Sequence, residues 1–180
     1  MSLATDCEVL PAHVVQLCND YRKGGISALA LISPNAAIYD FTSPNDWNTA
    51  ITAGDVVIIK NIKASFPKAK ALEGENVVSC GSEKMLDGFD GTVSWKDFNV
   101  NVDNDSFYGV LGQKQNWHLA LYNCTSNEIR VIDQPCTFIP LWAIVPEGQK
   151  DKQVYDVSAH WFAPNGWWPG LYAAPVGIFN

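Results

Sequence analysis

The chain has 180 residues, of which 47% are hydrophobic and 17% are charged, and its formal net charge is −7. This length fits a single domain over residues 1–180 with a full hydrophobic core. The negative charge argues against a general nucleic-acid binder, because such a protein needs a positive surface to replace counterions on phosphates. The high apolar content, with seven Trp and eight Phe, predicts that part of the surface is buried against partner chains.

The cysteines and the N-terminal residues exclude several other classes. The five cysteines form no CxxC pair, which excludes a zinc ribbon and a thioredoxin-like motif, and we expect reduced core thiols. The N-terminal residues lack the basic stretch and the long apolar run of a secretory signal. No apolar run approaches the roughly 20 residues that span a bilayer. We therefore expect a chain that is made in the cytoplasm and has no membrane partner.

The first 60 residues contain the clearest structural signals. Residues 1–23 are expected to form an N-terminal arm or a short helix, because apolar residues recur there at helical spacing before Gly24. Residues 26–32 and 56–60 are rich in β-branched and large apolar side chains, which predicts two buried strands.

A short helix is predicted between these two strands. Ser43 can cap it, Pro44 suits its first position, and Asp46 lies beside the positive helix end. Gly54 is expected to end it. One apolar stripe is predicted to lie on the two strands, formed by Trp47, Ala50 and Ile51.

Four lysines follow closely after the second strand, and Pro67 interrupts any regular element among them. The sequence predicts an exposed hairpin or loop that carries Lys60, Lys63, Lys68 and Lys70. The segment lacks the glycines and the GK[ST] ending of a P-loop, so nucleotide binding is not expected. A solvated loop is the simplest interpretation, and a charged protrusion that meets an acidic surface is the alternative.

Such an acidic surface is present in the segment 73–105, which has eight acids against Lys84 and Lys96. Short strands are predicted at 76–80 and 92–102, with turns at Gly81, Gly88 and Gly91. A basic loop and an acidic segment in one chain favour head-to-tail packing in a ring, because a heterologous interface joins two different patches.

A short helix is predicted over 103–112, with acids at its start and Gly112 near its end. Asn101, Asp103 and Asp105 also match the first three ligand positions of a calcium loop, but Ser106 and Gly112 break the pattern. An EF-hand is excluded. An acid cluster at a helix N-terminus is favoured over a nonstandard cation site.

The remaining chain predicts an antiparallel meander. A hairpin joins 117–124 to 128–133, and two further strands are expected at 137–145 and 153–162. Residues 163–180 form an apolar C-terminal tail, which is expected to dock on the core or on a neighbouring subunit. The predicted fold class is α+β, mainly antiparallel β as a sandwich or barrel-like sheet, with two or three short helices.

Few residues suggest chemistry. His13, His118 and His160 fall in no HExxH or Cys/His signature. His118 and His160 could face each other across the sheet, although a structural role is favoured for both. Nothing in the sequence around Cys124 or Cys136 indicates that either thiol is a nucleophile. We therefore assign no catalytic residue, no cofactor and no metal site, and we expect a protein that is not an enzyme.

The central block combines GGISALALIS, IYDFTSPNDWNTAITAG and VVIIK. This pattern resembles the N-terminal region of small virion structural proteins of tailed bacteriophages, particularly the crAss-like phages of Bacteroidetes. The resemblance covers about the first third of the chain. It implies a subunit of an oligomeric ring or tube in the neck or tail of the virion. It also implies contacts with other virion proteins and DNA that passes through a lumen.

The residues themselves suggest where copies would meet. The lysines and the aromatic residues near the C-terminus are candidates for interface contacts, namely Lys60, Lys63, Lys68, Lys70, Trp161, Trp167, Trp168, Tyr172 and Phe179. A carbohydrate- or receptor-binding β-sandwich is the first alternative, with Trp161, Trp167 and Trp168 as stacking platforms. A small hydrolase, with His118 or His160 near a carboxylate or thiol, is the second.

Overall fold

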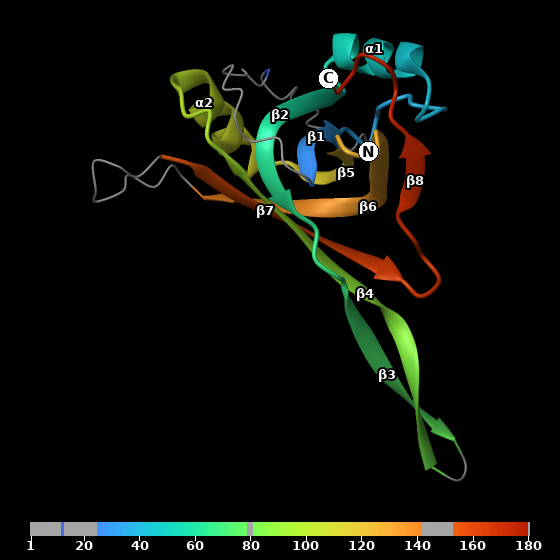
Figure 1. Ribbon diagram of the computed structural model, residues 1–180. Helices are drawn as coiled ribbons and strands as arrows, with labels where there is room; N and C mark the ends of the chain where they lie inside the picture. Colours follow the sequence, from blue (N-terminus) through green and yellow to red (C-terminus); the bar gives the residue numbers. More distant parts are fainter. Residues whose placement is uncertain (1–11, 13–24, 79–80, 142–152, 180) are drawn as a thin grey trace, which may run out of the picture.

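The structure is a computed structural model that describes residues 12, 25–78, 81–141 and 153–179 (Figure 1). These ranges form a mainly antiparallel β fold with two short helices, as the sequence predicted. The strands are β1 (Ile26–Ile32), β2 (Val56–Ser65), β3 (Lys70–Val78), β4 (Gly81–Asp97), β5 (Gln115–Asn123), β6 (Glu128–Leu141), β7 (Tyr155–Pro164) and β8 (Gly170–Ala173). The helices are α1 (Pro44–Ala53) and α2 (Val102–Leu111).

Six of the strands close into a barrel. They run in the order β2, β1, β5, β6, β7 and β4, and β4 pairs with β2 again. Every neighbouring pair is antiparallel. The closing seam is short, because its register covers only Lys63 with Lys96, Ala64 with Trp95, and Ser65 with Ser94. Closure leaves these six strands without an open edge at the barrel wall.

Alternation along the strands produces two hydrophobic cores. In β7 the residues Tyr155, Val157, Ala159, Trp161 and Ala163 are buried and point into the barrel, while the residues between them are more exposed. A second core lies on the outer face of β1, β5 and β6, beneath α1 and the C-terminal residues. The barrel wall is therefore buried on both faces where α1 covers it.

The predicted helix between the first two strands is confirmed as α1. Ser43 caps it, because its hydroxyl accepts a hydrogen bond from the Asp46 backbone N–H at 3.5 Å. Gly54 ends it in the left-handed conformation, with φ of 80°. Trp47 and Ala50 are the buried residues of the helix. The Trp47 indole N–H donates to the Phe41 carbonyl at 2.9 Å.

Helix α2 closes one end of the barrel. Asn101 caps it by accepting a hydrogen bond from the Asn104 backbone N–H at 2.8 Å, so the helix begins slightly before the predicted start. Phe107, Tyr108 and Leu111 join the buried cluster inside the barrel. The calcium-like run is thus the N-terminus of this helix. Within the described residues no three His, Cys, Asp or Glu side chains gather as metal ligands would.

The short strands expected at 76–80 and 92–102 are parts of longer strands, because β3 is Lys70–Val78 and β4 is one strand of 17 residues, and the turns expected at Gly88 and Gly91 are not formed. Gly88 and Gly91 lie inside it. A side chain at Gly88 would collide with the Ala163 carbonyl oxygen, and one at Gly91 would collide with the Trp161 indole. These two glycines allow β4 and β7 to approach closely, so here glycine within a strand marks a close contact and not a turn.

Strand β6 was also predicted as two pieces, 128–133 and the start of 137–145. The structure joins them into one strand from Glu128 to Leu141. The pairing with β5 shifts register between Trp117 and Leu119, so Asp133 to Pro135 form a bulge. Proline fits a bulge because its missing N–H is not needed in the ladder. The predicted strand residues 142–145 and the predicted turn at 146–152 lie outside the described residues, as does the predicted N-terminal arm or helix at 1–23 apart from residue 12.

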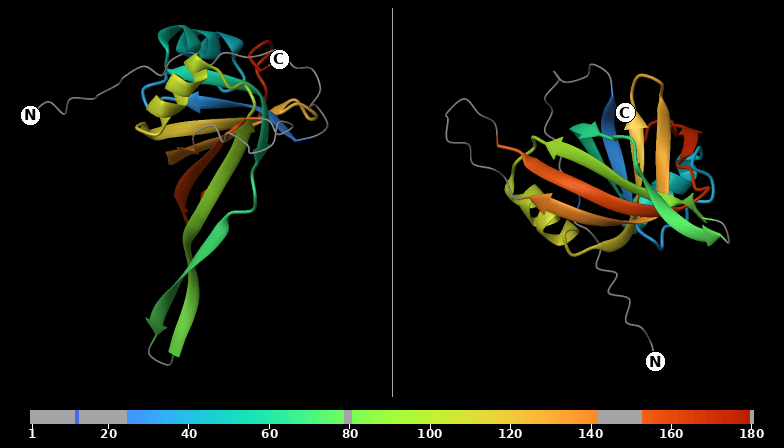
Figure 2. Two further views of the ribbon diagram at one scale, coloured as in Figure 1. Left: turned by 90° about the vertical axis from the view of Figure 1, so that its left-hand side faces the viewer. Right: turned by 90° about the horizontal axis from the view of Figure 1, so that it is seen from below.

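Strands β3 and β4 form a long ribbon that leaves the barrel. The pairing of β3 with β4 runs from Lys70 with Asp90 to Val78 with Gly81. Strand β4 pairs with β7 only from Gly88 onward. Figure 1 shows the ribbon extending away from the barrel, and the left view of Figure 2 shows both helices at the opposite end of the molecule.

The C-terminal residues pack on the barrel of their own chain. Strand β8, which the sequence did not predict, pairs with the start of β6. The Phe179 ring stacks on Tyr122 at a centroid distance of 5.1 Å and meets Trp47 edge-on at 5.3 Å. No helix among the described residues is long and apolar enough to cross a membrane.

Candidate binding site at the open end of the barrel

The end of the barrel opposite α2 contains a cavity of about 310 Å³. It lies where the ribbon leaves the barrel and where β7 ends. Eight of its ten lining residues are apolar, and five of these are aromatic or proline rings of the β2–β3 and β7–β8 connections. The lining residues are Phe66, Pro67, Lys68, Ala69, Phe89, Arg130, Trp161, Trp167, Trp168 and Pro169.

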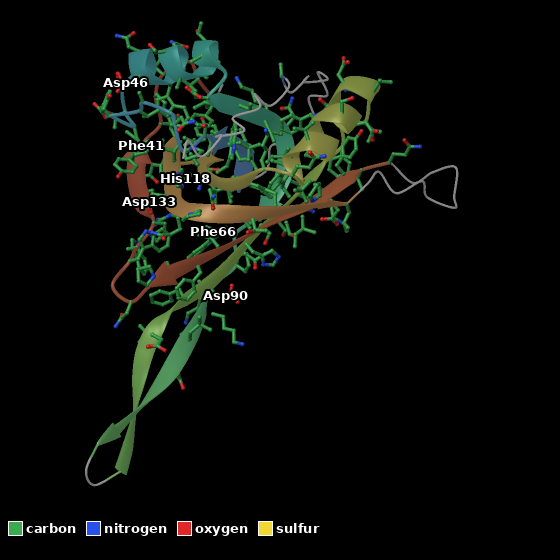
Figure 3. The ribbon with its side chains drawn as sticks, turned by 180° about the vertical axis from the view of Figure 1, so that it is seen from behind. Phe41, Asp46, Phe66, Asp90, His118 and Asp133 are labelled. Carbon is green, nitrogen blue, oxygen red and sulfur yellow. The ribbon has the colours of Figure 1, made fainter. Side chains whose placement is uncertain are left out.

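Trp161 forms the inner wall of the cavity. Its side chain is 4% exposed, and its ring lies 4.9 Å from the Trp167 ring and 6.5 Å from the Phe66 ring, measured between centroids. Gly91 on the neighbouring strand leaves room for this indole. Figure 3 labels Phe66 close to the base of the ribbon.

The loop between β7 and β8 is fixed in place by its hydrogen bonds. The Trp167 backbone N–H donates to the Pro164 carbonyl at 3.2 Å, and Gly166 adopts a φ of 84°, which suits glycine. The Trp167 indole N–H donates to Asp133 of β6 at 2.6 Å. The loop therefore presents Trp168, which is 76% exposed, from a defined position at the rim of the cavity.

The cavity rim is positive. Arg130 and Lys68 are the two charged residues among the lining residues, and no acid is among them. One guanidinium N–H of Arg130 donates to the Pro169 carbonyl at 3.4 Å, which holds its charge near the apolar walls. This combination favours an aromatic or apolar group that carries a neighbouring negative charge.

A second hollow of about 370 Å³ adjoins the first, because Phe66 and Arg130 line both. It is surrounded by the start of β1, the end of β5 and the start of β6, and it includes Glu128 beside Arg130. The open end of the barrel therefore offers an apolar cavity on one side of Arg130 and a more polar hollow on the other.

The structure corrects the prediction of a lysine-bearing loop. Lys60 and Lys63 lie in β2, which continues to Ser65, and Lys70 is the first residue of β3. The connection between these strands contains only residues 66–69, so Lys68 is the one predicted lysine in a loop. Lys63, Lys68 and Lys70 are exposed and Lys60 is partly buried. Lys68 and Lys70 thus lie at the base of the ribbon, whereas Lys60 and Lys63 lie on the barrel wall, opposite Ala28 of β1 and Lys96 of β4.

The predicted aromatic residues divide into two groups. Trp161, Trp167 and Trp168 meet at the cavity, although they come from β7 and the loop that follows. Tyr172 lies on β8 and packs on Phe41 with a centroid distance of 5.0 Å. Trp161 and Phe179 are each 4% exposed, because their rings fill the cores of their own chain, and this leaves little of either ring to contact a second copy.

The predicted histidine pair is not formed as expected. His118 lies on β5 and His160 on β7, and β6 runs between these strands, so the two side chains do not face each other across neighbouring strands. His160 Nδ1 lies 3.1 Å from the Thr92 hydroxyl. His13 lies outside the described residues.

The structure also argues against Cys136 as a nucleophile. Burial raises the pKa of the Cys136 thiol to about 12, and a thiol that stays protonated is a poor nucleophile.

A buried polar network, which the sequence did not reveal, lies at the α2 end of the barrel. Asp97 is fully buried and accepts hydrogen bonds from the Tyr108 hydroxyl, the Asn99 backbone N–H and the Asn99 side chain, each at 2.8 Å. Asn104 donates to the Asn99 carbonyl at 2.7 Å. These bonds attach α2 to β4, so the network has a structural role.

Burial, followed by the charge of Asp97, raises the pKa of the Tyr108 hydroxyl well above its usual value. The network therefore holds Tyr108 as a neutral hydrogen-bond donor to the Asp97 carboxylate.

Comparison of the chain with protein families, with curated proteins and with solved structures finds no match. The function is accordingly inferred from the geometry described above and from the sequence.

Proposed function

We propose that the chain is a non-enzymatic structural subunit that assembles with copies of itself into a ring or tube. The β3–β4 ribbon is the observation that carries this proposal. Over residues 81–87, β4 pairs only with β3 among the described strands, and β3 pairs only with β4. The ribbon therefore presents two strand edges outside the barrel.

An isolated two-stranded ribbon is marginally stable in water, and its free N–H and C=O groups invite pairing with another chain. A ribbon of this kind is stabilised when it lies along a neighbouring subunit, which buries its edges or its faces. Contact through one protruding element and a different receiving surface is heterologous, and repetition of such a contact produces a ring or a filament.

Charge supports contact between copies. By sequence, residues 73–87 of the ribbon carry four acids against Lys84, whereas Lys68 and Lys70 lie at the base of the ribbon. An acidic ribbon of one copy and a basic base on the next are complementary surfaces, which steer association more than they add to affinity.

The resemblance to phage neck and tail subunits supports a virion as the location of this assembly. In that setting the partners are other virion proteins, and DNA passes through the lumen of the ring. Mass spectrometry of purified phage particles tests the location directly. Absence of the chain from particles of a phage that encodes it would contradict a virion role.

A ribbon deletion tests self-assembly. Leu72 and Gly88 are opposite each other in the β3–β4 ladder, so an Asn-Gly turn can join them in place of residues 73–87. We expect the full chain to form oligomers of one defined mass by native mass spectrometry and rings by electron microscopy. The shortened chain should still unfold in one cooperative transition, but it should no longer form the rings of the full chain.

Two outcomes would contradict the proposal. A full chain that stays monomeric at micromolar concentration would contradict self-assembly altogether. Oligomers that persist unchanged in the shortened chain would show that the ribbon does not hold the copies together. A folded deletion variant that forms no rings, beside a full chain that does, is the supporting result.

The cavity supports a second candidate, a carbohydrate- or receptor-binding module. Trp167 and Trp168 offer aromatic faces, but Lys68 and Arg130 are the only charged or polar lining residues, and a sugar needs several hydrogen-bonding groups for its hydroxyls. Retention of the protein on glycans, lost in Trp168→Ala, would favour this candidate. A chain that assembles but does not bind glycans would exclude a carbohydrate-binding module.

A further inference from the structure

One aromatic side chain extends from the surface of the chain far from the cavity. Tyr39 lies in the segment between β1 and α1, and its side chain is 91% exposed. Its backbone is nevertheless fixed, because the Tyr39 N–H donates to the Asp46 carboxylate at 3.1 Å and the Asp40 N–H donates to the same oxygen at 3.0 Å. Tyr39 is therefore an exposed aromatic on a rigid segment.

Two further sets of contacts hold this segment. The Asp40 carboxylate accepts hydrogen bonds from the Thr42 backbone N–H at 2.8 Å and from the Thr42 hydroxyl at 2.7 Å. The Phe41 ring lies 6.3 Å from Trp47 and 5.0 Å from Tyr172, measured between centroids. Because the backbone at Tyr39 is already ordered, binding has to order only its side chain, which lowers the entropy cost for an interface anchor.

The charge around Tyr39 is opposite to the charge around the cavity. Asp40 and Asp46 lie beside Tyr39, whereas Lys68 and Arg130 line the cavity. The walls of the cavity are aromatic, so they offer edge and face contacts to an inserted tyrosine ring. The charges beside Tyr39 and the charges that line the cavity are thus opposite in sign, and both surfaces offer aromatic rings.

The two surfaces lie apart on one chain. Figure 3 labels Phe41 and Asp46 beside α1 and Phe66 at the base of the ribbon. In Figure 1 the segment before α1 and the β7–β8 loop lie at opposite ends of β8. Since Tyr39 is exposed in its own chain, a complementary cavity must come from another molecule.

We propose that Tyr39 of one copy inserts into the cavity of a second copy, with its ring beside Trp167 and Trp168 and with Asp40 facing Lys68. The contact rests on the proposed self-assembly, but it uses neither edge of the ribbon. Repetition in one direction extends a ring or tube, whereas two reciprocal insertions give a dimer. Both arrangements contain the same contact.

Two variants remove the two halves of this contact. Tyr39→Ala removes the inserted ring, and the double variant Lys68→Glu, Trp168→Ala changes the rim of the cavity. All three side chains are exposed, so the variants should melt at the wild-type temperature. Val102→Ala is the matched control, because Val102 is also exposed, at 83%, and lies on α2 at the other end of the barrel.

Sedimentation velocity across a concentration series measures the association. Each variant alone should associate at least about tenfold more weakly than the wild type, which corresponds to the loss of one interface anchor, and Val102→Ala should be unchanged. An equimolar mixture of the two variants should form a one-to-one complex, because Tyr39 of the cavity variant can still enter the intact cavity of the Tyr39→Ala variant.

The outcomes separate this inference from the function proposed above. Wild-type association in Tyr39→Ala, or a mixture of folded variants that stays monomeric, would overturn the insertion. Ring formation with unchanged association in Tyr39→Ala would overturn the insertion but keep the ring. A wild type that forms only dimers, lost in Tyr39→Ala and restored in the mixture, would keep the insertion and overturn the ring.

Discussion

The indole Nε1 of Trp167 lies 2.6 Å from Oδ1 of Asp133, and this hydrogen bond joins the β7–β8 loop to the bulge in β6. Residue 133 and residue 167 are far apart in the sequence, and each belongs to a segment without regular hydrogen bonding. The bond therefore couples the shape of the cavity to the bulge that bends the barrel wall.

Removal of this acceptor should loosen the cavity wall. In Asp133→Ala the Trp167 N–H loses its acceptor, and we expect a loss of about 0.5–1.5 kcal/mol in the free energy of unfolding, as for a typical intramolecular hydrogen bond, because this bond is exposed to solvent. Acrylamide quenching of tryptophan fluorescence should increase. Asp133→Asn is the matched control, since its amide oxygen can still accept the bond, and equal quenching in both variants would contradict this role.

A side chain at position 91 should separate β4 from β7. The new Cβ of Gly91→Ala would overlap the Trp161 indole, which is buried and has little room to move, so we expect a loss of about 2 kcal/mol or more. Urea unfolding followed by circular dichroism measures this loss.

Gly109→Ala is a matched control for that substitution. A Cβ at Gly109 would meet nothing within 4 Å, and alanine replaces glycine there inside α2. This change should raise the stability by about 0.5–1 kcal/mol, because alanine is the better helix former. Equal effects of the two substitutions would show that the close contact at Gly91 is unimportant.

The Tyr108 hydroxyl should make the fold sensitive to alkali. Its pKa is raised in the folded chain, so the unfolded chain releases this proton first, near pH 10. The contribution of neutral Tyr108 to stability is fully present below that pH and falls as the pH rises toward the folded-state pKa. Tyr108→Phe should weaken this dependence in chemical unfolding measured from pH 8 to 11.

The same variant should be less stable at neutral pH. Tyr108→Phe deprives the buried Asp97 carboxylate of one donor, which should cost about 1–3 kcal/mol. Two donors from Asn99 remain, so we expect a folded protein. A pH profile identical to that of the wild type would show that Tyr108 is not the group responsible.

The C-terminal residues should contribute to the fold of the single chain. Phe179→Ala removes a buried ring between Trp47 and Tyr122, and substitutions of this kind cost about 3–5 kcal/mol. Val176→Ala, at a side chain that is 82% exposed, should change the stability by less than about 0.5 kcal/mol. Equal melting temperatures for the two variants would contradict a core role for Phe179.

Local signals predicted the elements whose determinants lie close together in the chain. Ser43, Pro44 and Gly54 act within one helix, so α1 and the strand before it were predicted correctly, and the strand after it was predicted with its start but too short. The β5–β6 hairpin was predicted for the same reason, because its turn lies between two apolar runs. Long strands were predicted less well, since Gly91 and Pro135 indicate a break in any reading that is limited to neighbouring residues.

The sequence by itself determined the mainly antiparallel β class, α1 with its cap and stop, and the hairpin after Trp117, because these follow from propensities and spacings over a few residues. Only the tertiary structure decided that the barrel closes through β2 and β4 and that the ribbon projects from it. It also decided that Trp161 and Phe179 fill cores while Trp168 and Tyr39 are exposed. The reason is physical: closure, burial and the cavity depend on contacts between residues far apart in the chain, and no local pattern encodes which distant surface an aromatic ring will meet.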